Sequence, residues 1–176
     1  MIHGTAGPGY RYYFHREGLL EAGIATFEVD FKSGIFSDSR DRPYPQPLIP
    51  FAYGALKALR KNAAVDPKRI GLMGFSFGGG ITVAAMEHVQ KLKALGGSEK
   101  GFLGHVAYYP SCRFRKILPS TCAPLLILAG GEDSYGDGKF CGAFIESFNQ
   151  INPGLGSLKI YPGVEHGFDG NKSWSG

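Results

Sequence analysis

A serine stands between two glycines in the segment Gly-Phe-Ser-Phe-Gly at 74–78. An apolar run precedes this segment at 70–73, and a run with helical character follows it at 81–89. A strand that turns directly into a helix leaves one residue at the apex in a strained backbone state, and close crowding on either side favours glycine. The apex hydroxyl then stands clear at a helix N-terminus, whose partial positive charge favours a developing oxyanion. The pattern predicts that Ser76 is a nucleophile.

A serine hydroxyl is a weak nucleophile at neutral pH and needs a base. His166 follows the short predicted strand at 157–161, and loops after strand ends gather at one edge of a parallel sheet, where ligands bind. We therefore predict that His166 is the base, with an exposed loop histidine as the alternative. His15 and His88 fall in predicted helices and His105 in a predicted strand, so we interpret these three as structural.

The base in turn needs a carboxylate that orients the imidazole and stabilises the imidazolium ion. The apolar segment 124–129 leads to Asp133, which we predict to fill this role. Asp137 and Glu132 are the alternatives, and turn capping or solvent exposure would explain any of the three without chemistry. Asp30 also ends a predicted strand, but it precedes the serine in the chain, and we interpret it as a loop-ordering group.

Strands and helices must alternate along the chain to position these side chains. Short apolar runs separated by helices are typical of a parallel sheet covered on both faces. We therefore predict an α/β fold with a doubly wound, mostly parallel sheet. Strands are expected at 1–3, 24–29, 70–74, 103–109, 124–129 and 157–161, helices at 13–22, 48–62, 77–95 and 139–151, and loops at 4–12 and 31–47.

The length of 176 residues predicts one domain. The first residues read as the last part of a strand, and no final helix is predicted after His166. We therefore expect residues 1–176 to form a single α/β domain, truncated at both ends, that lacks its first strands and its last helix.

The formal net charge of +4 is modest, and the Lys and Arg residues are scattered, which argues against a nucleic-acid partner. No apolar run is long enough to cross a membrane. A nucleotide-binding module is the competing class for a glycine-rich chain, but the Gly-x-x-x-x-Gly-Lys-Ser/Thr pattern is absent.

Three cysteines are present, at 112, 122 and 141, and their spacing does not suit a metal site. We interpret them as buried apolar thiols. A Cys112–Cys141 disulfide is the alternative, because both residues would lie near the ends of adjacent strands, and it would require an oxidising compartment. A cytoplasmic and a periplasmic or secreted location therefore both stay open.

These features together resemble the α/β-hydrolase superfamily. The resemblance rests on the chain order Ser76, Asp133, His166, on the elbow, on Gly-x-x-Asp at 130–133, and on His-Gly-Thr-Ala-Gly at 3–7. The segment Tyr-Pro-Gly-x-x-His-Gly-Phe-Asp at 161–169 points more narrowly to the dienelactone hydrolase family.

The resemblance spans most of the chain and implies a serine hydrolase of esters, lactones or related acyl compounds, acting on a small-molecule substrate without a metal or organic cofactor. It implies that the backbone N–H of Phe77 and one near Thr5 form the oxyanion hole, with an ordinary loop at 4–7 as the alternative. Tyr108 and Tyr109 close a predicted strand, and each is either a wall of the substrate pocket or part of a packing turn.

The founding dienelactone hydrolases carry cysteine at the elbow, whereas this chain carries Ser76. The difference favours a general esterase-like relative over a lactone-specific one. A peptidase or a thioesterase on the same scaffold is the alternative among enzymes, and a catalytically inactive scaffold relative is the alternative outside them.

Overall fold

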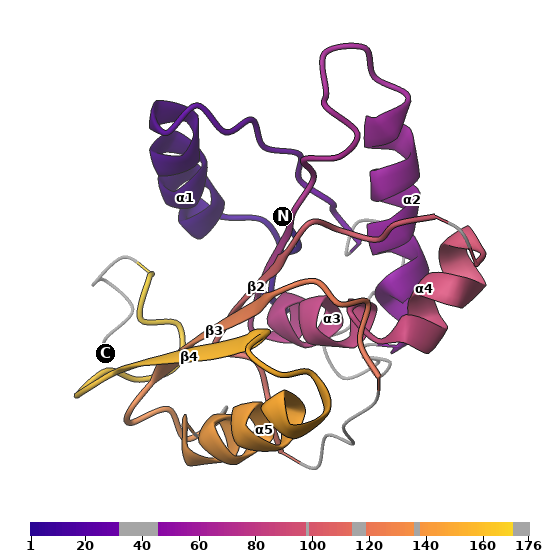
Figure 1. The fold of residues 1–176 in the computed structure, drawn as a ribbon. Helices are drawn as coiled ribbons and strands as arrows, with labels where there is room; N and C mark the ends of the chain where they lie inside the picture. The colour runs from indigo at the N-terminus through magenta and orange to yellow at the C-terminus, as the bar shows by residue number, and fades with distance from the viewer. Residues whose placement is uncertain (32–45, 98, 114–118, 136–137, 171–176) are drawn as a thin grey trace.

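The computed structural model describes residues 1–31, 46–97, 99–113, 119–135 and 138–170 (Figure 1). Two sequence predictions lie outside the described residues. They are most of the loop at 31–47 and Asp137, the alternative carboxylate.

Four parallel strands form the sheet, in the spatial order β1, β2, β3, β4. All four fall at predicted strand positions, and their bounds are β1 (Leu72–Phe75), β2 (His105–Tyr108), β3 (Leu125–Gly130) and β4 (Gly156–Tyr161). Ile2 continues the sheet beyond β1 through parallel bridges to Gly74 and to Val29. Within the described residues, the strands expected at 1–3 and 24–29 are therefore reduced to isolated bridges at Ile2 and Val29.

The helices are close to their predicted positions, with two differences. Their bounds are α1 (Tyr10–Glu21), the short 3-10 helix η1 (Gln46–Leu48), α2 (Ile49–Arg60), α3 (Phe77–Ala85), α4 (His88–Leu95) and α5 (Gly138–Ile151). The first difference concerns α1, which begins three residues before the predicted start at residue 13. Tyr12 is buried against the sheet, and its N–H donates to the carbonyl of Gly9 at 2.9 Å, so packing extends the helix into the predicted loop.

The second difference is that the single helix predicted at 77–95 is wrong, because the chain breaks it between α3 and α4. Glu87 has an extended backbone, with ψ at 129°, and forms an antiparallel bridge with Ser120. The carbonyl of Met86 accepts a hydrogen bond from the N–H of Thr121. A tertiary contact with residues far along the chain thus replaces the local helical hydrogen bonds. No local sequence pattern predicts this break.

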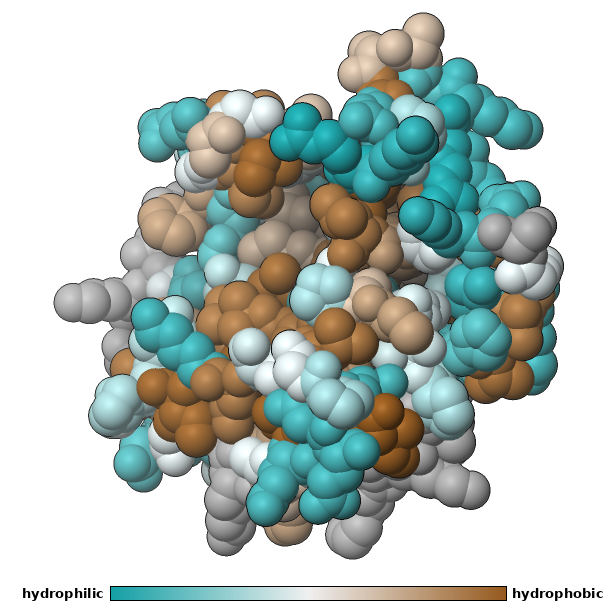
Figure 2. All heavy atoms as spheres, viewed as in Figure 1, coloured by the Kyte–Doolittle hydropathy of each residue, from teal (hydrophilic) through white to brown (hydrophobic). Residues whose placement is uncertain are grey.

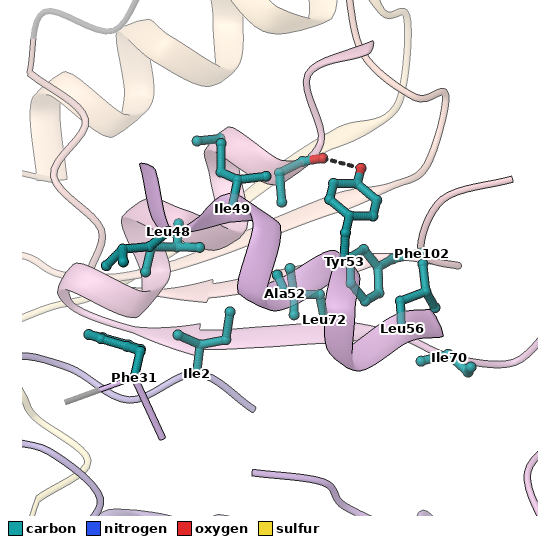
Figure 3. Close-up of a cluster of buried hydrophobic side chains, with 13 residues drawn as sticks. Ile2, Phe31, Leu48, Ile49, Ala52, Tyr53, Leu56, Ile70, Leu72 and Phe102 are labelled. Carbon is teal, nitrogen blue, oxygen red and sulfur yellow. Dashed lines mark hydrogen bonds between the residues drawn. The ribbon is translucent and has the colours of Figure 1, made fainter. Parts of the chain in front are cut away.

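The sheet separates two apolar layers. On one face, α2 and α3 pack over Ile2 and Leu72, and Figure 3 shows this cluster with Tyr53 donating its hydroxyl hydrogen to the Ala85 carbonyl. On the same face, α3 and α5 pack against side chains of β2 and β3 that point to this side of the sheet.

Tyr12 of α1 packs on the opposite face, against Phe75 and Tyr109. Figure 1 shows α1 and α5 on opposite sides of the strands. Helices therefore cover both faces, which confirms the predicted α/β fold with a parallel sheet.

A disulfide joins Cys112, which follows β2, to Cys141 in α5. The interpretation of these two residues as separate thiols is therefore wrong, and the alternative pairing is the one found. The third residue, Cys122, is a free thiol but is exposed, so the expectation of burial is wrong there too.

Hydrophobic side chains gather over the strands in the middle of the face shown in Figure 2, while hydrophilic ones cover much of α2. No helix among the described residues combines the length and the apolar character needed to cross a bilayer.

Candidate active site

Ser76 lies at the sharp turn between β1 and α3, with φ 52° and ψ −112°. This is a strained conformation for a residue with a side chain. A Cβ added at Gly74 would overlap the carbonyl of Gly78, and one added at Gly78 would overlap the carbonyl of Ile2. The two glycines of the motif are therefore required by close backbone approach, the second one by the N-terminal segment that packs across the turn.

The structure brings three predicted residues together at the carboxyl edge of the sheet. His166 Nε2 lies 2.8 Å from Ser76 Oγ, and His166 Nδ1 lies 2.8 Å from Asp133 Oδ2. Ser76 follows β1, Asp133 follows β3, and His166 follows β4. Because parallel strands end at the same edge, residues 90 and 33 positions apart meet there.

The hydrogen bonds fix which nitrogen of His166 carries the proton. An ionised carboxylate only accepts hydrogen bonds, so Nδ1–H must donate to Asp133. In the neutral ring, Nε2 then carries a lone pair and accepts the hydroxyl hydrogen of Ser76. The Ser76 hydroxyl is thus aimed at a nitrogen that can receive its proton.

Asp133 is held rigidly for this contact. Its side chain is 1% exposed, and its second oxygen, Oδ1, accepts the N–H of Tyr135 at 2.9 Å. Glu132, its neighbour and the alternative carboxylate, has an exposed side chain. A Cβ added at Gly130 would overlap the carbonyl of Val164, so the end of β3 and the histidine loop approach closely only because residue 130 is glycine.

The segment 4–7 lies directly beside the serine, since a Cβ added at Gly4 would be 3.4 Å from the Cβ of Ser76. The Gly4 carbonyl accepts hydrogen bonds from His3 Nδ1 at 2.6 Å and from the Gly7 N–H at 3.2 Å. In a trans peptide the C=O and the following N–H point in opposite directions. The N–H of Thr5 therefore points away from the His3 ring.

Phe77 is the first residue of α3, and its N–H belongs to the helical turn whose amides have no partner within the helix. Its ring packs toward Phe31 and the core. Asp30, interpreted as a loop-ordering group, lies 3.2 Å from Nε2 of the buried His3.

The two tyrosines at the end of β2 lie in different environments. Tyr109 is 1% exposed, has φ 35°, and directs its ring to within 4.8 Å of the His166 ring centre. Tyr108 packs against Phe75 and His15, and burial, together with the negative charge of Asp169, raises its pKa to about 12. The Tyr108 ring is therefore packed against other aromatic rings and stays neutral at physiological pH.

Some residues lie beside the site although the sequence analysis predicted no role for them there. Tyr135 is 77% exposed, and its ring centre lies 5.3 Å from that of His166. Asp169 and His15 are hydrogen-bonded to each other beside Tyr109. Asp169 follows the histidine by three positions in a recognised motif, which is a usable signal, whereas nothing in the sequence marks His15.

His88 begins α4 and is exposed, and His105 begins β2 and is 2% exposed. Neither approaches Ser76. Within the part of the chain that the structure describes, no group of three or more His, Cys, Asp or Glu side chains is arranged to hold a metal ion.

Known proteins resemble this chain in sequence and in fold. The sequence profile of the dienelactone hydrolase family matches residues 48–175. The uncharacterized protein YfhR of Salmonella typhimurium is 30% identical over 87 residues, a match that covers 49% of this chain and 29% of that protein's length.

Solved structures share the fold at low sequence identity. A thermophilic esterase of Thermogutta terrifontis with propionate bound superposes with a TM-score of 0.67 at 19% identity, covering 95% of this chain and 72% of the esterase. An α/β serine hydrolase without a lid from Xanthomonas campestris gives a TM-score of 0.67 at 15% identity, with coverages of 95% and 72%. With its parallel sheet, its serine turn and a family match over most of its length, the chain belongs to the dienelactone hydrolase family.

Proposed function

We propose that this chain is a serine hydrolase that cleaves a carboxylic ester, a lactone or a related acyl bond. The observation that carries the proposal is the continuous hydrogen-bonded series from Ser76 through His166 to Asp133, with both distances at 2.8 Å. A nucleophile within reach of a base, and a base oriented by a third group, is the geometry that activates a serine.

In this mechanism the Ser76 oxygen attacks the substrate carbonyl while His166 Nε2 accepts the hydroxyl proton. The resulting imidazolium is stabilised by the Asp133 carboxylate, and it then donates the proton to the leaving group. A water molecule, activated by the same nitrogen, hydrolyses the acyl-enzyme and releases the acid. Each step uses only side chains that lie within hydrogen-bond distance of one another.

The oxyanion of the tetrahedral intermediate needs hydrogen-bond donors close to Ser76. We propose the backbone N–H groups of Phe77 and Thr5 for this role. The support is the position of Phe77 at the start of α3 and the hydrogen bonds that turn the Gly4 carbonyl toward His3. The loss of one such donor typically costs about 2.7–4 kcal/mol of transition-state stabilisation.

The substrate is proposed to be a small acyl compound. A fold relative binds propionate, which favours short carboxylic acids as the acyl part. The ring centre of the exposed Tyr135 lies 5.3 Å from that of His166, and we propose that Tyr135 lines the path of the acyl or leaving group, whereas the buried Tyr109 packs beside the base. A panel of p-nitrophenyl esters of increasing chain length, tested beside thioesters and peptide amides, separates esterase, thioesterase and peptidase activity.

A fluorophosphonate probe tests the proposal, because it reacts covalently only with an activated serine. We expect the folded chain to be labelled, and the label to map to Ser76. The matched control is Ser111→Ala, which removes the hydroxyl of another serine that follows a strand at the same edge. Labelling lost in Ser76→Ala and kept in Ser111→Ala supports the proposal, and an unlabelled folded wild-type chain identifies an inactive scaffold relative instead.

A further inference from the structure

A second hydrogen-bonded cluster lies beside the proposed catalytic residues. Asp169 Oδ1 accepts the hydroxyl hydrogen of Tyr109 at 2.6 Å, and Asp169 Oδ2 lies 2.7 Å from Nε2 of His15. All three are shielded from solvent: Tyr109 is 1% exposed, and the side chains of Asp169 and His15 are 6% and 11% exposed. We call Tyr109, Asp169 and His15 the Asp169 cluster.

The hydrogen bonds of the cluster assign its protons. A carboxylate is an acceptor only, so both the Tyr109 hydroxyl and Nε2–H of His15 donate to Asp169. Each carboxylate oxygen therefore has its own donor. Such bonds are needed here, because a buried carboxylate without donors would be strongly unfavourable.

The cluster contacts the loop that carries the base. Asp169 lies three residues after His166, and the ring of the intervening Phe168 packs against Tyr109 at 5.4 Å and Tyr161 at 4.9 Å. Tyr109 thus contacts this loop at three residues, because its hydroxyl binds Asp169, its ring packs against Phe168, and its ring centre lies 4.8 Å from that of His166.

The same cluster is connected to the serine side of the site. The His15 ring, which comes from α1, packs at 4.9 Å from Phe75 and at 4.8 Å from Tyr108. Phe75 is the residue directly before Ser76, and the Tyr108 carbonyl accepts the Ser76 N–H at 2.9 Å. Through its bonds to Tyr109 and His15, the Asp169 carboxylate therefore connects the ends of β1 and β2 with the loop that carries His166.

We propose that the Asp169 cluster is a positioning device, which holds His166 Nε2 at hydrogen-bond distance from Ser76 Oγ. The inference rests on the proposed function. Asp169, Tyr109 and His15 are positioning residues in this account, because they act through His166. A loosened loop would move the His166 imidazole away from Ser76. A displacement of about 1 Å can lower the rate about 100-fold.

The test replaces Tyr109 with Phe, which keeps the ring and removes the hydroxyl bond to Asp169. Hydrolysis of p-nitrophenyl acetate by Tyr109→Phe is expected to show a kcat reduced about tenfold or more with a nearly unchanged KM, since the change affects the alignment of the base and not the binding of substrate. The rate of fluorophosphonate labelling at Ser76 is expected to fall in parallel.

Tyr53→Phe is the matched control. Tyr53 is also 1% exposed, and its hydroxyl donates to the Ala85 carbonyl at 2.6 Å, in the core cluster of Figure 3. Both variants lose one buried hydroxyl bond and are expected to lose a comparable amount of stability. Only Tyr109→Phe is expected to lose kcat per folded molecule.

A second pair of variants tests the His15 arm without touching a ring beside the base. His15→Leu removes the donor to Asp169, whereas His15→Gln offers an amide N–H in its place. We expect His15→Gln to recover part of the kcat that is lost in His15→Leu.

The outcomes separate this inference from the proposed function. A wild-type chain that is not labelled at Ser76 refutes the proposed function, and the inference falls with it. A labelled wild-type chain whose Tyr109→Phe variant keeps the wild-type kcat and labelling rate refutes the positioning inference alone. An equal loss of kcat in Tyr53→Phe also refutes it, because the effect would then follow stability.

Discussion

At the residue scale, the orientation of the His166 imidazole decides whether the proposed chemistry can occur. Asp133 accepts from His166 Nδ1, and this leaves Nε2 free to take the proton of Ser76. The oxygen of Asp133 that does not face the ring accepts the Tyr135 N–H, so the carboxylate cannot turn away without losing a backbone hydrogen bond.

Asp133→Asn should keep the fold and lose the activity. The asparagine oxygen can still accept the Tyr135 N–H, which leaves its NH2 group facing His166 Nδ1. The ring then carries its proton on Nε2 and cannot act as a base toward Ser76. We expect kcat to fall about 10⁴-fold with an unchanged thermal midpoint, measured by ester hydrolysis and by thermal unfolding. Retention of a tenth of the wild-type kcat would show that Asp133 is not the orienting group.

Sequence reasoning reached the three central side chains because each has a local signature. Ser76 lies in a strand-turn-helix context, Asp133 follows an apolar run, and His166 follows a short predicted strand. It did not reach the partnership of Asp169 with His15, because that contact joins residues 154 positions apart and depends on how α1 lies on the sheet. Side-chain pairs between distant elements leave no pattern in a single sequence.

At the element scale, close backbone approach explains which positions must be glycine. The end of β3 meets the histidine loop at Gly130, where a side chain would overlap the carbonyls of Val164 and Glu165. Gly142, in contrast, lies in α5, and a Cβ there would meet only Leu158, at 4.0 Å.

Gly130→Ala should therefore displace the loop that carries His166. We expect a loss of about 1–3 kcal/mol in the free energy of unfolding, together with a reduced kcat, because the loop must move to admit the methyl group. The control Gly142→Ala should be neutral or stabilising by up to about 1 kcal/mol, since alanine favours a helix interior. Chemical denaturation and ester hydrolysis measure both variants, and equal behaviour of the two would contradict the steric argument.

The disulfide links the segment after β2 to α5 and closes a loop of 29 residues in sequence. In the chain-entropy account, a cross-link of this span restricts the unfolded state and contributes about 3–4 kcal/mol to stability. The double variant Cys112→Ala, Cys141→Ala should unfold at a correspondingly lower denaturant concentration. Cys122→Ala, which removes the exposed thiol, should not. A midpoint unaffected by loss of the disulfide would contradict this assignment.

The elements themselves were predictable where their pattern is local. The strands and α5 follow apolar runs and helical spacing, and their type and order were correct from sequence. The break between α3 and α4 was not predictable, because residues 86 and 87 bond to the distant segment 119–121 instead of continuing the helix. The 24–29 segment has the composition of a strand, yet within the described residues it pairs only through Val29.

At the scale of the whole molecule, one buried histidine makes the free energy of unfolding depend on pH. His105, at the start of β2, is 2% exposed, and burial lowers its pKa to about 4. In the unfolded chain its pKa is near the ordinary value of about 6.5. Between these values the unfolded state binds the proton and the folded state does not, so stability rises with pH across this window.

His105→Leu should flatten that part of the stability profile. We expect the wild-type chain to lose up to about 3 kcal/mol from this residue alone as the pH falls from about 6.5 to about 4. In His105→Leu, the free energy of unfolding should not show this part of the decrease. Urea denaturation at several pH values measures the difference. His88→Gln, a change at an exposed histidine, should keep the wild-type slope. An unchanged slope in His105→Leu would show that His105 does not titrate as proposed.

The central claim concerns the whole arrangement, in which three strand ends deliver one serine, one histidine and one carboxylate to the same point. The most direct measurement is mass spectrometry of the chain quenched during turnover of a p-nitrophenyl ester. We predict an adduct with the mass of the acyl group on the peptide that contains Ser76, formed more slowly in His166→Gln and absent in Ser76→Ala. Turnover of the ester without any acyl adduct on Ser76, or with the adduct on another residue, would contradict the account.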